Sequence, residues 1–135
     1  MLAQLVEESK NTVVAAIKGT DDIVSALRGA VVNQVTGLAK NATDVTGSIA
    51  DVAEGAIDGA VQVGTDIGGA SVSVVEGVIQ AAGSIGVSTT VAAEAAVTGV
   101  LRAANAIGGD TLKTVKSALS TAASIPAEVV KKVLG

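Results

Sequence analysis

The side chains that most often perform catalysis or bind metals are scarce in this sequence of 135 residues. It contains no histidine and no cysteine, so the most common general base, the thiolate nucleophile and the soft metal ligands are all missing. A serine or threonine nucleophile would then need lysine as its base, yet residues 41–101 contain neither lysine nor arginine. These observations predict a protein that is not an enzyme.

The acidic residues are not spaced for shared chemistry either. Glu7 and Glu8 are adjacent, as are Asp21 and Asp22, and neighbouring side chains on a helix point about 100° apart. The segment "KGT" at 18–20 has the residues of a phosphate-binding Walker motif in the wrong order. We therefore expect no catalytic residue, no cofactor and no metal ion.

Charge is distributed unevenly along the chain, whose net charge is −4. Residues 41–101 contain seven acidic and no basic residues, whereas residues 102–135 contain five basic and two acidic ones. Nucleic-acid binding would need a continuous basic surface with stacking aromatic rings, and the sequence has no Phe, Trp or Tyr. We expect no nucleic-acid partner. The basic tail could instead contact the acidic middle of a second copy, the alternative being a merely uneven solvated surface.

The elements that position these residues are indicated by an internal repeat. "GVIQAAGSIG" at 77–86 recurs as "GVLRAANAIG" at 99–108. The pattern divides the chain into blocks that begin near residues 15, 37, 59, 77, 99 and 121, preceded by an expected lead-in helix at 1–14. Four of the intervals between blocks are 22, which is two 11-residue hendecads, and the remaining one is 18, which is five turns of α-helix. The repeat predicts one all-α domain over residues 1–135, built from long amphipathic helices.

Two sets of residues in the repeat are predicted to make helix contacts. The ninth position of each block is always Ile or Val and predicts an apolar packing column of Ile23, Val45, Ile67, Ile85, Ile107 and Val129. Glycine costs about 1 kcal/mol of helix propensity relative to alanine, so glycines inside a helix indicate the close approach of another backbone. We assign this second role to Gly55, Gly59, Gly77 and Gly99.

Helix ends are predicted from glycines and capping residues. The pairs Gly68-Gly69 and Gly108-Gly109 are predicted to form turns. In "KGTDD" at 18–22, a helix should end at Gly19 and the next should begin with Thr20 as its cap; "SIPAE" at 124–128 should start a last helix capped by Ser124. Two architectures stay open: helices folded into a hairpin or bundle, or a few very long helices.

Three other features of the sequence bear on its class. "VQVGTDIGGASVSVV" at 61–75 alternates as a β-strand would, but its flanking segments favour helix. Residues 77–93 are uncharged, yet they are few and partly polar for a membrane span. The start, "MLAQLVEESK", is acidic where a signal peptide is basic, so we expect no signal peptide and a cytoplasmic location by default.

The segment "SVVEGVIQAAGSIG" at 73–86 resembles the central repeats of the synucleins. Its 11-residue period is shared with the apolipoproteins and perilipins, and the resemblance covers about the middle half of the chain. It implies amphipathic helices that lie on a lipid or storage-granule surface. The lysines with which synuclein-like repeats would contact anionic headgroups are missing from residues 41–101. Neutral lipid, a polymer granule or another copy of the chain would not need them.

The sequence therefore predicts two functions. The first is a structural protein that self-associates through small-residue helical repeats into a homo-oligomeric bundle, filament or tube. The second is an amphipathic helical coat on lipid or storage granules. The expected partners are accordingly other copies of the chain or an apolar surface.

Overall fold

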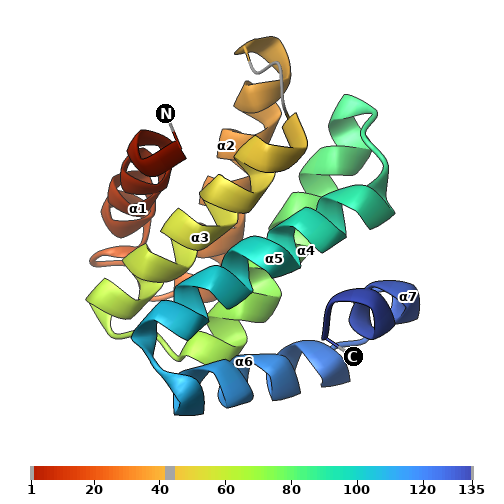
Figure 1. Ribbon diagram of the computed structural model, residues 1–135. Coiled ribbons are helices and arrows are strands. Elements are labelled where there is room, and N and C mark those ends of the chain that lie inside the picture. Colours follow the sequence, from red (N-terminus) through yellow and green to blue (C-terminus); the bar gives the residue numbers. More distant parts are fainter. Residues whose placement is uncertain (1, 42–44, 135) are drawn as a thin grey trace.

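The computed structural model of the protein describes residues 2–41 and 45–134, and every regular element in these ranges is a helix (Figure 1). The all-α prediction is confirmed, and the strand-like segment at 61–75 lies in two helices and the linker between them. The elements are α1 (Leu2–Ile17), α2 (Ile23–Asn41), α3 (Val45–Val63), α4 (Ile67–Ile85), α5 (Thr89–Ile107), α6 (Gly109–Thr121), α7 (Ala127–Val129) and a final π-helical turn, η1 (Val130–Leu134).

The four central helices follow one another at a constant interval. Helices α2 to α5 begin at residues 23, 45, 67 and 89, and each contains 19 residues. The helix starts are 22 residues apart, and each interval of 22 residues holds one helix and a short connection. Of the two architectures left open by the sequence, the chain adopts the bundle. A continuous run of hendecads would have given a few very long helices, but the chain reverses direction after each helix.

The reversals after α3 and after α4 each use a glycine followed by a capping residue. Gly64 and Gly86 adopt positive φ angles of 91° and 79°, which favour glycine, directly after α3 and α4. The side chain of Asp66 then accepts a hydrogen bond from the Gly69 N–H at 3.1 Å, and that of Ser88 accepts one from the Val91 N–H at 3.3 Å. Each short linker therefore ends one helix and caps the next.

Two of the predicted helix boundaries are correct. Gly19 has a φ of 81° just after α1, and Gly108 separates α5 from α6, although Gly109 of the predicted turn is already the first residue of α6. Gly68-Gly69 is not a turn, because both glycines lie in the first turn of α4 and the reversal occurs at Gly64.

The two predicted capping residues are also replaced by others. Asp22, rather than Thr20, accepts a hydrogen bond from the Ser25 N–H at 3.1 Å at the start of α2. Pro126 precedes α7 where Ser124 was expected as cap, and α7 has no side-chain cap.

The helices form two layers (Figure 1). Helices α1, α3 and α5 lie side by side in the front layer, with α2 and α4 behind them. The most extensive contacts join helices two places apart in the chain: α1 with α3, α3 with α5, and α2 with α4. Helix α6 crosses the lower end and packs on α4 and α5, and the C-terminal turns pack on α5.

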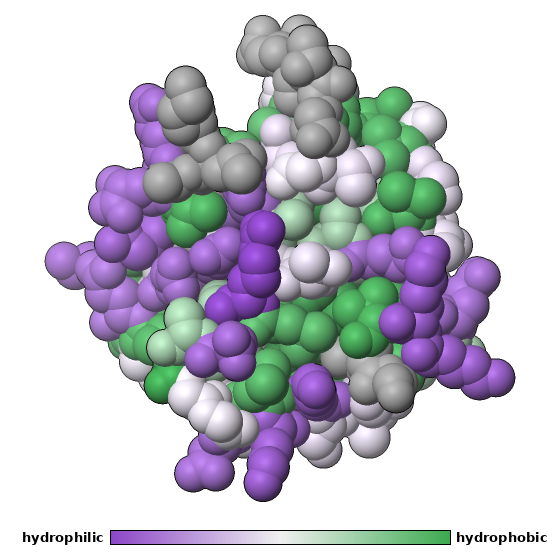
Figure 2. Space-filling model, viewed as in Figure 1, coloured by the Kyte–Doolittle hydropathy of each residue, from purple (hydrophilic) through white to green (hydrophobic). Residues whose placement is uncertain are grey.

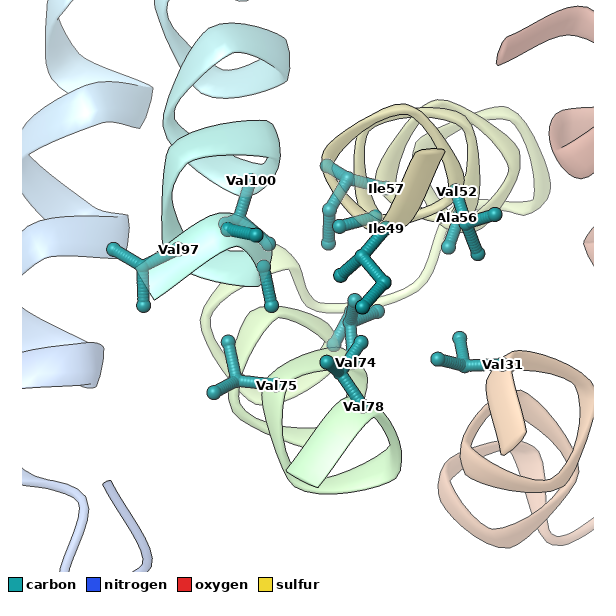
Figure 3. Close-up of a cluster of buried hydrophobic side chains, with 14 of the residues drawn as sticks. Val31, Ile49, Val52, Ala56, Ile57, Val74, Val75, Val78, Val97 and Val100 are labelled. Carbon is teal, nitrogen blue, oxygen red and sulfur yellow. The ribbon is translucent and has the colours of Figure 1, made fainter. Parts of the chain in front are cut away.

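The core lies between the two layers and consists of small aliphatic side chains (Figure 3). Ile49 and Ile57 of α3 face Val74 and Val78 of α4, and all four are fully buried. With no aromatic ring in the sequence, stability must come from many close contacts between short side chains, and these bring the helix axes near one another.

The surface combines polar regions with dispersed apolar residues. Figure 2 shows polar side chains over α1 and over the C-terminal segment, with apolar areas between them. The large hydrophobic residues exposed in the described ranges belong to three helices: Val24, Val61, Val91 and Ile107. No helix in the described part of the chain is long and apolar enough to cross a membrane.

Candidate interaction site

The six residues of the predicted packing column lie at helix ends. Ile23, Val45 and Ile67 are the first residues of α2, α3 and α4. Ile85 and Ile107 are the last residues of α4 and α5. The shorter step in the column, from Ile67 to Ile85, therefore runs along α4 from its first residue to its last, and no repeat is shortened there.

These positions do not form one continuous apolar column. Val129, at the end of α7, is fully buried, whereas Ile107 is 46% exposed. The other four are half-buried and pack against the margin of the core. Their physical role is to cover the ends of the core where the chain reverses, which explains why an aliphatic residue recurs at the interval of the reversals.

The four predicted close-approach glycines all lie where another helix backbone comes near. A Cβ atom at Gly59 of α3 would be 2.9 Å from the Lys10 carbonyl oxygen of α1, and one at Gly77 of α4 would be 3.0 Å from the Arg28 carbonyl oxygen of α2. At Gly55 it would lie 2.7 Å from the Ser9 Cβ. Real Cβ atoms essentially never come closer than 3.0 Å to such atoms, so Gly55 and Gly59 set the distance between α1 and α3, and at Gly77 a Cβ would be tighter than nearly all real contacts.

Three of these contacts repeat one geometry. The carbonyl oxygens of Val6, Arg28 and Ala50 face Gly55, Gly77 and Gly99. The difference between the two residue numbers is 49 in every case (55 − 6, 77 − 28 and 99 − 50), and each contact follows the previous one by one helix and its linker. The same helix–helix contact is therefore made by α3 on α1, by α4 on α2 and by α5 on α3.

Each of these glycines is the centre of a stripe of three small or short side chains spaced four positions apart, which we call the small-residue face. On α3, α4 and α5 all nine members are buried, and the glycines among them face the helix two places earlier, whereas Asp51 is paired with Arg102 of the helix two places later. The nine members are Asp51, Gly55 and Gly59; Ser73, Gly77 and Ala81; and Ala95, Gly99 and Ala103.

Ion pairs join the same helices beside the glycine contacts. Arg102 of α5 reaches α3, where its Nη2 lies 3.0 Å from Asp51 Oδ1 and its Nε lies 3.0 Å from Glu54 Oε1. Arg28 Nη2 of α2 lies 2.9 Å from Glu76 Oε1 of α4. Part of the acidic middle is thus neutralised within the chain by basic residues from outside it.

The basic tail also contacts the acidic middle within one copy. Lys132 Nζ of η1 lies 3.3 Å from Glu94 Oε1 of α5, although the Lys132 side chain is 71% exposed. We expected such a contact between copies. The proximity of η1 to α5 makes it available inside a single chain.

Burial affects the carboxylates of α3 differently along its length. Asp51 is 2% exposed, and its Oδ2 atom has no hydrogen-bond partner among the described residues. Burial raises the pKa of Glu54, against the opposing effect of Arg102. Burial likewise raises the pKa of Asp58, although the nearby Lys10 acts in the other direction. Glu54 and Asp58 of α3 are therefore harder to ionise in the folded protein than in the unfolded chain.

The sequence did not indicate these polar contacts. Arg28 pairs with Glu76 of the helix two places later, and Glu54 pairs with Arg102 in the same way. The hydroxyl of Ser9 donates to the Val52 carbonyl at 2.9 Å. In each of these polar contacts, the two residues are separated in the sequence by a number of positions close to that of the glycine contacts. This separation can be recognised as a signal only once the alternation of the two layers is known.

The described surface offers shallow hollows rather than an enclosed site. One of about 350 Å³ lies between α5, α6 and the C-terminal turn and is lined by Leu101, Arg102, Leu112, Lys116 and Val133, among others. No group of three or more His, Cys, Asp or Glu side chains that could hold a metal ion occurs in residues 2–41 and 45–134. The repeated helix contact is the feature of the described chain with a defined and recurring geometry.

Comparison with protein-family models, with curated proteins and with solved structures finds no match to this chain.

Proposed function

We propose that this protein is a non-enzymatic structural protein that self-associates into a homo-oligomer, which could extend as a bundle, filament or tube. One observation carries the proposal: the contact between a small-residue face and a neighbouring backbone is made three times with the same sequence separation. The helices that make it are never consecutive in the chain. The contact therefore depends on matching faces and not on a linker, so helices of two different copies can form it as well.

We further propose that the repeat unit is one helix with its linker and that the two layers form a short α-solenoid. The constant spacing of α2 to α5 supports this unit. In this array each helix packs most extensively on the helix two places away, so the helices at the two ends present faces that a further helix would have covered. Such faces are either closed by special terminal elements or available to another molecule.

The distribution of charged groups also supports a structural role. Arg28, Arg102 and Asp51 connect helices to one another, and these contacts occupy groups that a catalytic site would need free. The apolar faces on which a lipid-coating function would depend are buried between the layers, including Ile49 and Val74. A lipid or granule coat would therefore require the bundle to open on the surface.

Sedimentation velocity of the full chain over a range of concentrations tests the proposal, combined with circular dichroism with and without vesicles of neutral lipid. We expect a helical spectrum without lipid and a sedimentation coefficient that rises with concentration. A helical monomer at every concentration would contradict self-association. A disordered monomer that becomes helical only on vesicles would contradict it too, and would favour the coat.

A further inference from the structure

The repeated helix contact has a receiving side, whose place on each helix can be followed along the chain. The carbonyl oxygens that face Gly55, Gly77 and Gly99 come from α1, α2 and α3, and they are 22 residues apart (28 − 6 and 50 − 28). Two further steps of this length reach Val72 of α4 and Glu94 of α5. We call the side of a helix that bears this position its receiving side. On α1, α2 and α3 it lies against a helix of 19 residues, and α6 packs on α4.

The C-terminal segment takes this place on α5. The element two places after α5 is α7, which has three residues and continues directly into η1. We call residues 122–134 the C-terminal strap, and both of its helical turns pack on α5. Lys132 of the strap pairs with Glu94, the α5 residue of the receiving series, at 3.3 Å. The strap therefore lies where the pattern of the earlier helices would place another helix.

The strap covers α5 less completely than a long helix covers the earlier receiving sides. Val13 belongs to the receiving side of α1, because a Cβ at Gly59 would lie 3.1 Å from its Cγ1. Val13 and its equivalents Val35 and Ile57 on α2 and α3 are all fully buried. The equivalent residue of α5 is Leu101, which is half-buried. A hollow of about 350 Å³ remains beside it, between α5, α6 and η1. The strap thus fills only part of the space that a helix would take.

Few residues hold the strap on the bundle. Ile125 and Val129 are 4% and 0% exposed, but the Lys132 side chain is 71% exposed. Helix α7 begins after Pro126 without a side-chain cap. Residues 122–134 contain no glycine, so the strap cannot bring its backbone as close to α5 as the long helices come to their neighbours. The strap is therefore easier to displace than any of the 19-residue helices.

We propose that the C-terminal strap is an autoinhibitory element: it occupies on α5 the position where a helix of a second copy packs, and it limits self-association until it is displaced. This inference rests on the proposed self-association and adds its control. A second copy is the occupant because three receiving sides of this chain already take helices of the same chain through one geometry. The hollow beside Leu101 leaves part of the α5 side open to such a helix.

Opening of the strap and association of two copies are then linked. A second copy binds only a chain whose strap is open, so the apparent dissociation constant equals the intrinsic one divided by the fraction of open chains. A change that opens the strap should strengthen association even though it weakens the single chain. These opposite signs distinguish an autoinhibitory strap from a segment that only stabilises the fold.

Sedimentation equilibrium of Val129→Asp tests the proposal. A carboxylate at this fully buried position favours the open strap. We expect the melting temperature to fall, the helical circular-dichroism spectrum to be retained, and the dissociation constant of the oligomer to fall by about tenfold or more. Ala127→Asp, at an exposed position of the same turn, is the matched control and should leave the dissociation constant unchanged.

A second substitution separates docking on α5 from unspecific aggregation of a loosened chain. Leu101→Lys puts a charge on the receiving side of α5, and a helix cannot pack there without burying that charge. Val129→Asp combined with Leu101→Lys should therefore lose the gain in association. A double variant that assembles as tightly as Val129→Asp alone would overturn the proposal.

The ion pair of the strap gives a test that leaves the core intact. Lys132→Glu places a second carboxylate beside Glu94 at an exposed side chain, and it should lower the dissociation constant by up to about fivefold. Adding Glu94→Lys restores a pair of opposite charges and should return the dissociation constant to the wild-type value. If the reversed pair left the constant at the value of Lys132→Glu, the closing contact assigned to the strap would be wrong.

The outcomes separate the two proposals. If the wild type assembles and neither Val129→Asp nor Lys132→Glu assembles more tightly, the strap is not autoinhibitory, while self-association stands. If only these opened variants assemble, the strap proposal stands and the closed chain is a monomer, contrary to the proposed function. If all of these proteins are monomers at every concentration, both proposals fail.

Discussion

Glycine has two opposite roles in this molecule, and the environment of each residue determines which one applies. Gly99 lies against the Ala50 carbonyl group, and a Cβ there would be 3.0 Å from the Ala53 Cβ. Gly83 is exposed on α4 with nothing within 4 Å. The first glycine is required by packing, whereas the second only lowers the propensity of its helix.

Substitution of these two glycines should therefore shift stability in opposite directions. We expect Gly99→Ala to lower the free energy of unfolding by about 1–3 kcal/mol, because α3 and α5 must move apart to admit the methyl group. Gly83→Ala should raise it by up to about 1 kcal/mol. Urea denaturation followed by far-ultraviolet circular dichroism measures both. Equal effects of the two substitutions would show that α5 does not depend on a close contact at Gly99.

The roles of Gly55, Gly59, Gly77 and Gly99 could be predicted because a helical glycine has a known cost that something must offset. The column of Ile and Val residues was harder to place. A recurring aliphatic residue is equally compatible with a continuous helix face and with the ends of successive helices. Only the backbone shows that Ile67 starts α4 and Ile85 ends it.

At the scale of elements, α3 lies between α1 and α5 and bears the acidic groups that burial affects most. Its Asp58 faces Lys10 and Glu7 of α1, and burial raises the pKa of Asp58 above the ordinary 3.8. Burial also raises the pKa of Glu54 above 4.5. A carboxyl group whose pKa is higher in the folded state than in the unfolded state lowers the free energy of unfolding at pH values where it is ionised in both states.

Because the pKa values of Glu54 and Asp58 are raised in the folded state, we predict that mild acidification stabilises the fold. As the pH falls from 7 through the raised pKa values of Glu54 and Asp58, the melting temperature should rise, and this contribution should level off below their ordinary values. Asp22 acts in the opposite direction at lower pH, because hydrogen bonding to Ser25 lowers its pKa and the stability it contributes is lost on protonation.

Thermal unfolding between pH 7 and pH 4 checks the prediction with two variants. Asp58→Asn should be more stable than the wild type at pH 7 and should show a smaller rise on acidification. Glu8→Gln, at an exposed position of α1, is the control and should follow the wild-type profile. A melting temperature that falls steadily from pH 7 in all three proteins would contradict the role given to α3.

The existence and helical type of the elements could be predicted from the sequence, but their boundaries only in part. Gly19 and Gly108 were found because a glycine after an apolar run often ends a helix. Gly68-Gly69 gave a stronger local signal than Gly64, yet Asp66 caps the helix that contains this pair, and α6 packs beside it so that a Cβ at Gly68 would lie 3.5 Å from the Ala118 Cβ. The packing of a distant helix cannot be predicted from the local pattern.

At the scale of the whole molecule, the C-terminal segment closes one end of the array. Ile125 and Val129 are 4% and 0% exposed, whereas Lys132 lies at the surface. The segment thus adds apolar cover to α5 and contributes one exposed ion pair. The two contributions differ in size, since burial of an aliphatic side chain is worth about 1.5–3 kcal/mol and an exposed ion pair about 0–1 kcal/mol.

Removal of residues 122–135 should therefore lower the free energy of unfolding by about 3 kcal/mol or more, while the remaining helices still form. Lys132→Gln in the full chain should change it by no more than about 1 kcal/mol. Urea denaturation of the three proteins measures the difference. A truncated chain as stable as the full one would show that the segment is not a closing element.

The constant sequence separation between contacting helices also has a consequence for synthesis. When a helix leaves the ribosome, the helix on which it packs has already emerged, two helices earlier in the chain. At roughly 5–20 residues per second, that delay is on the order of a few seconds. Docking can then keep pace with translation, so that only the most recently made helices expose uncovered apolar faces at any moment.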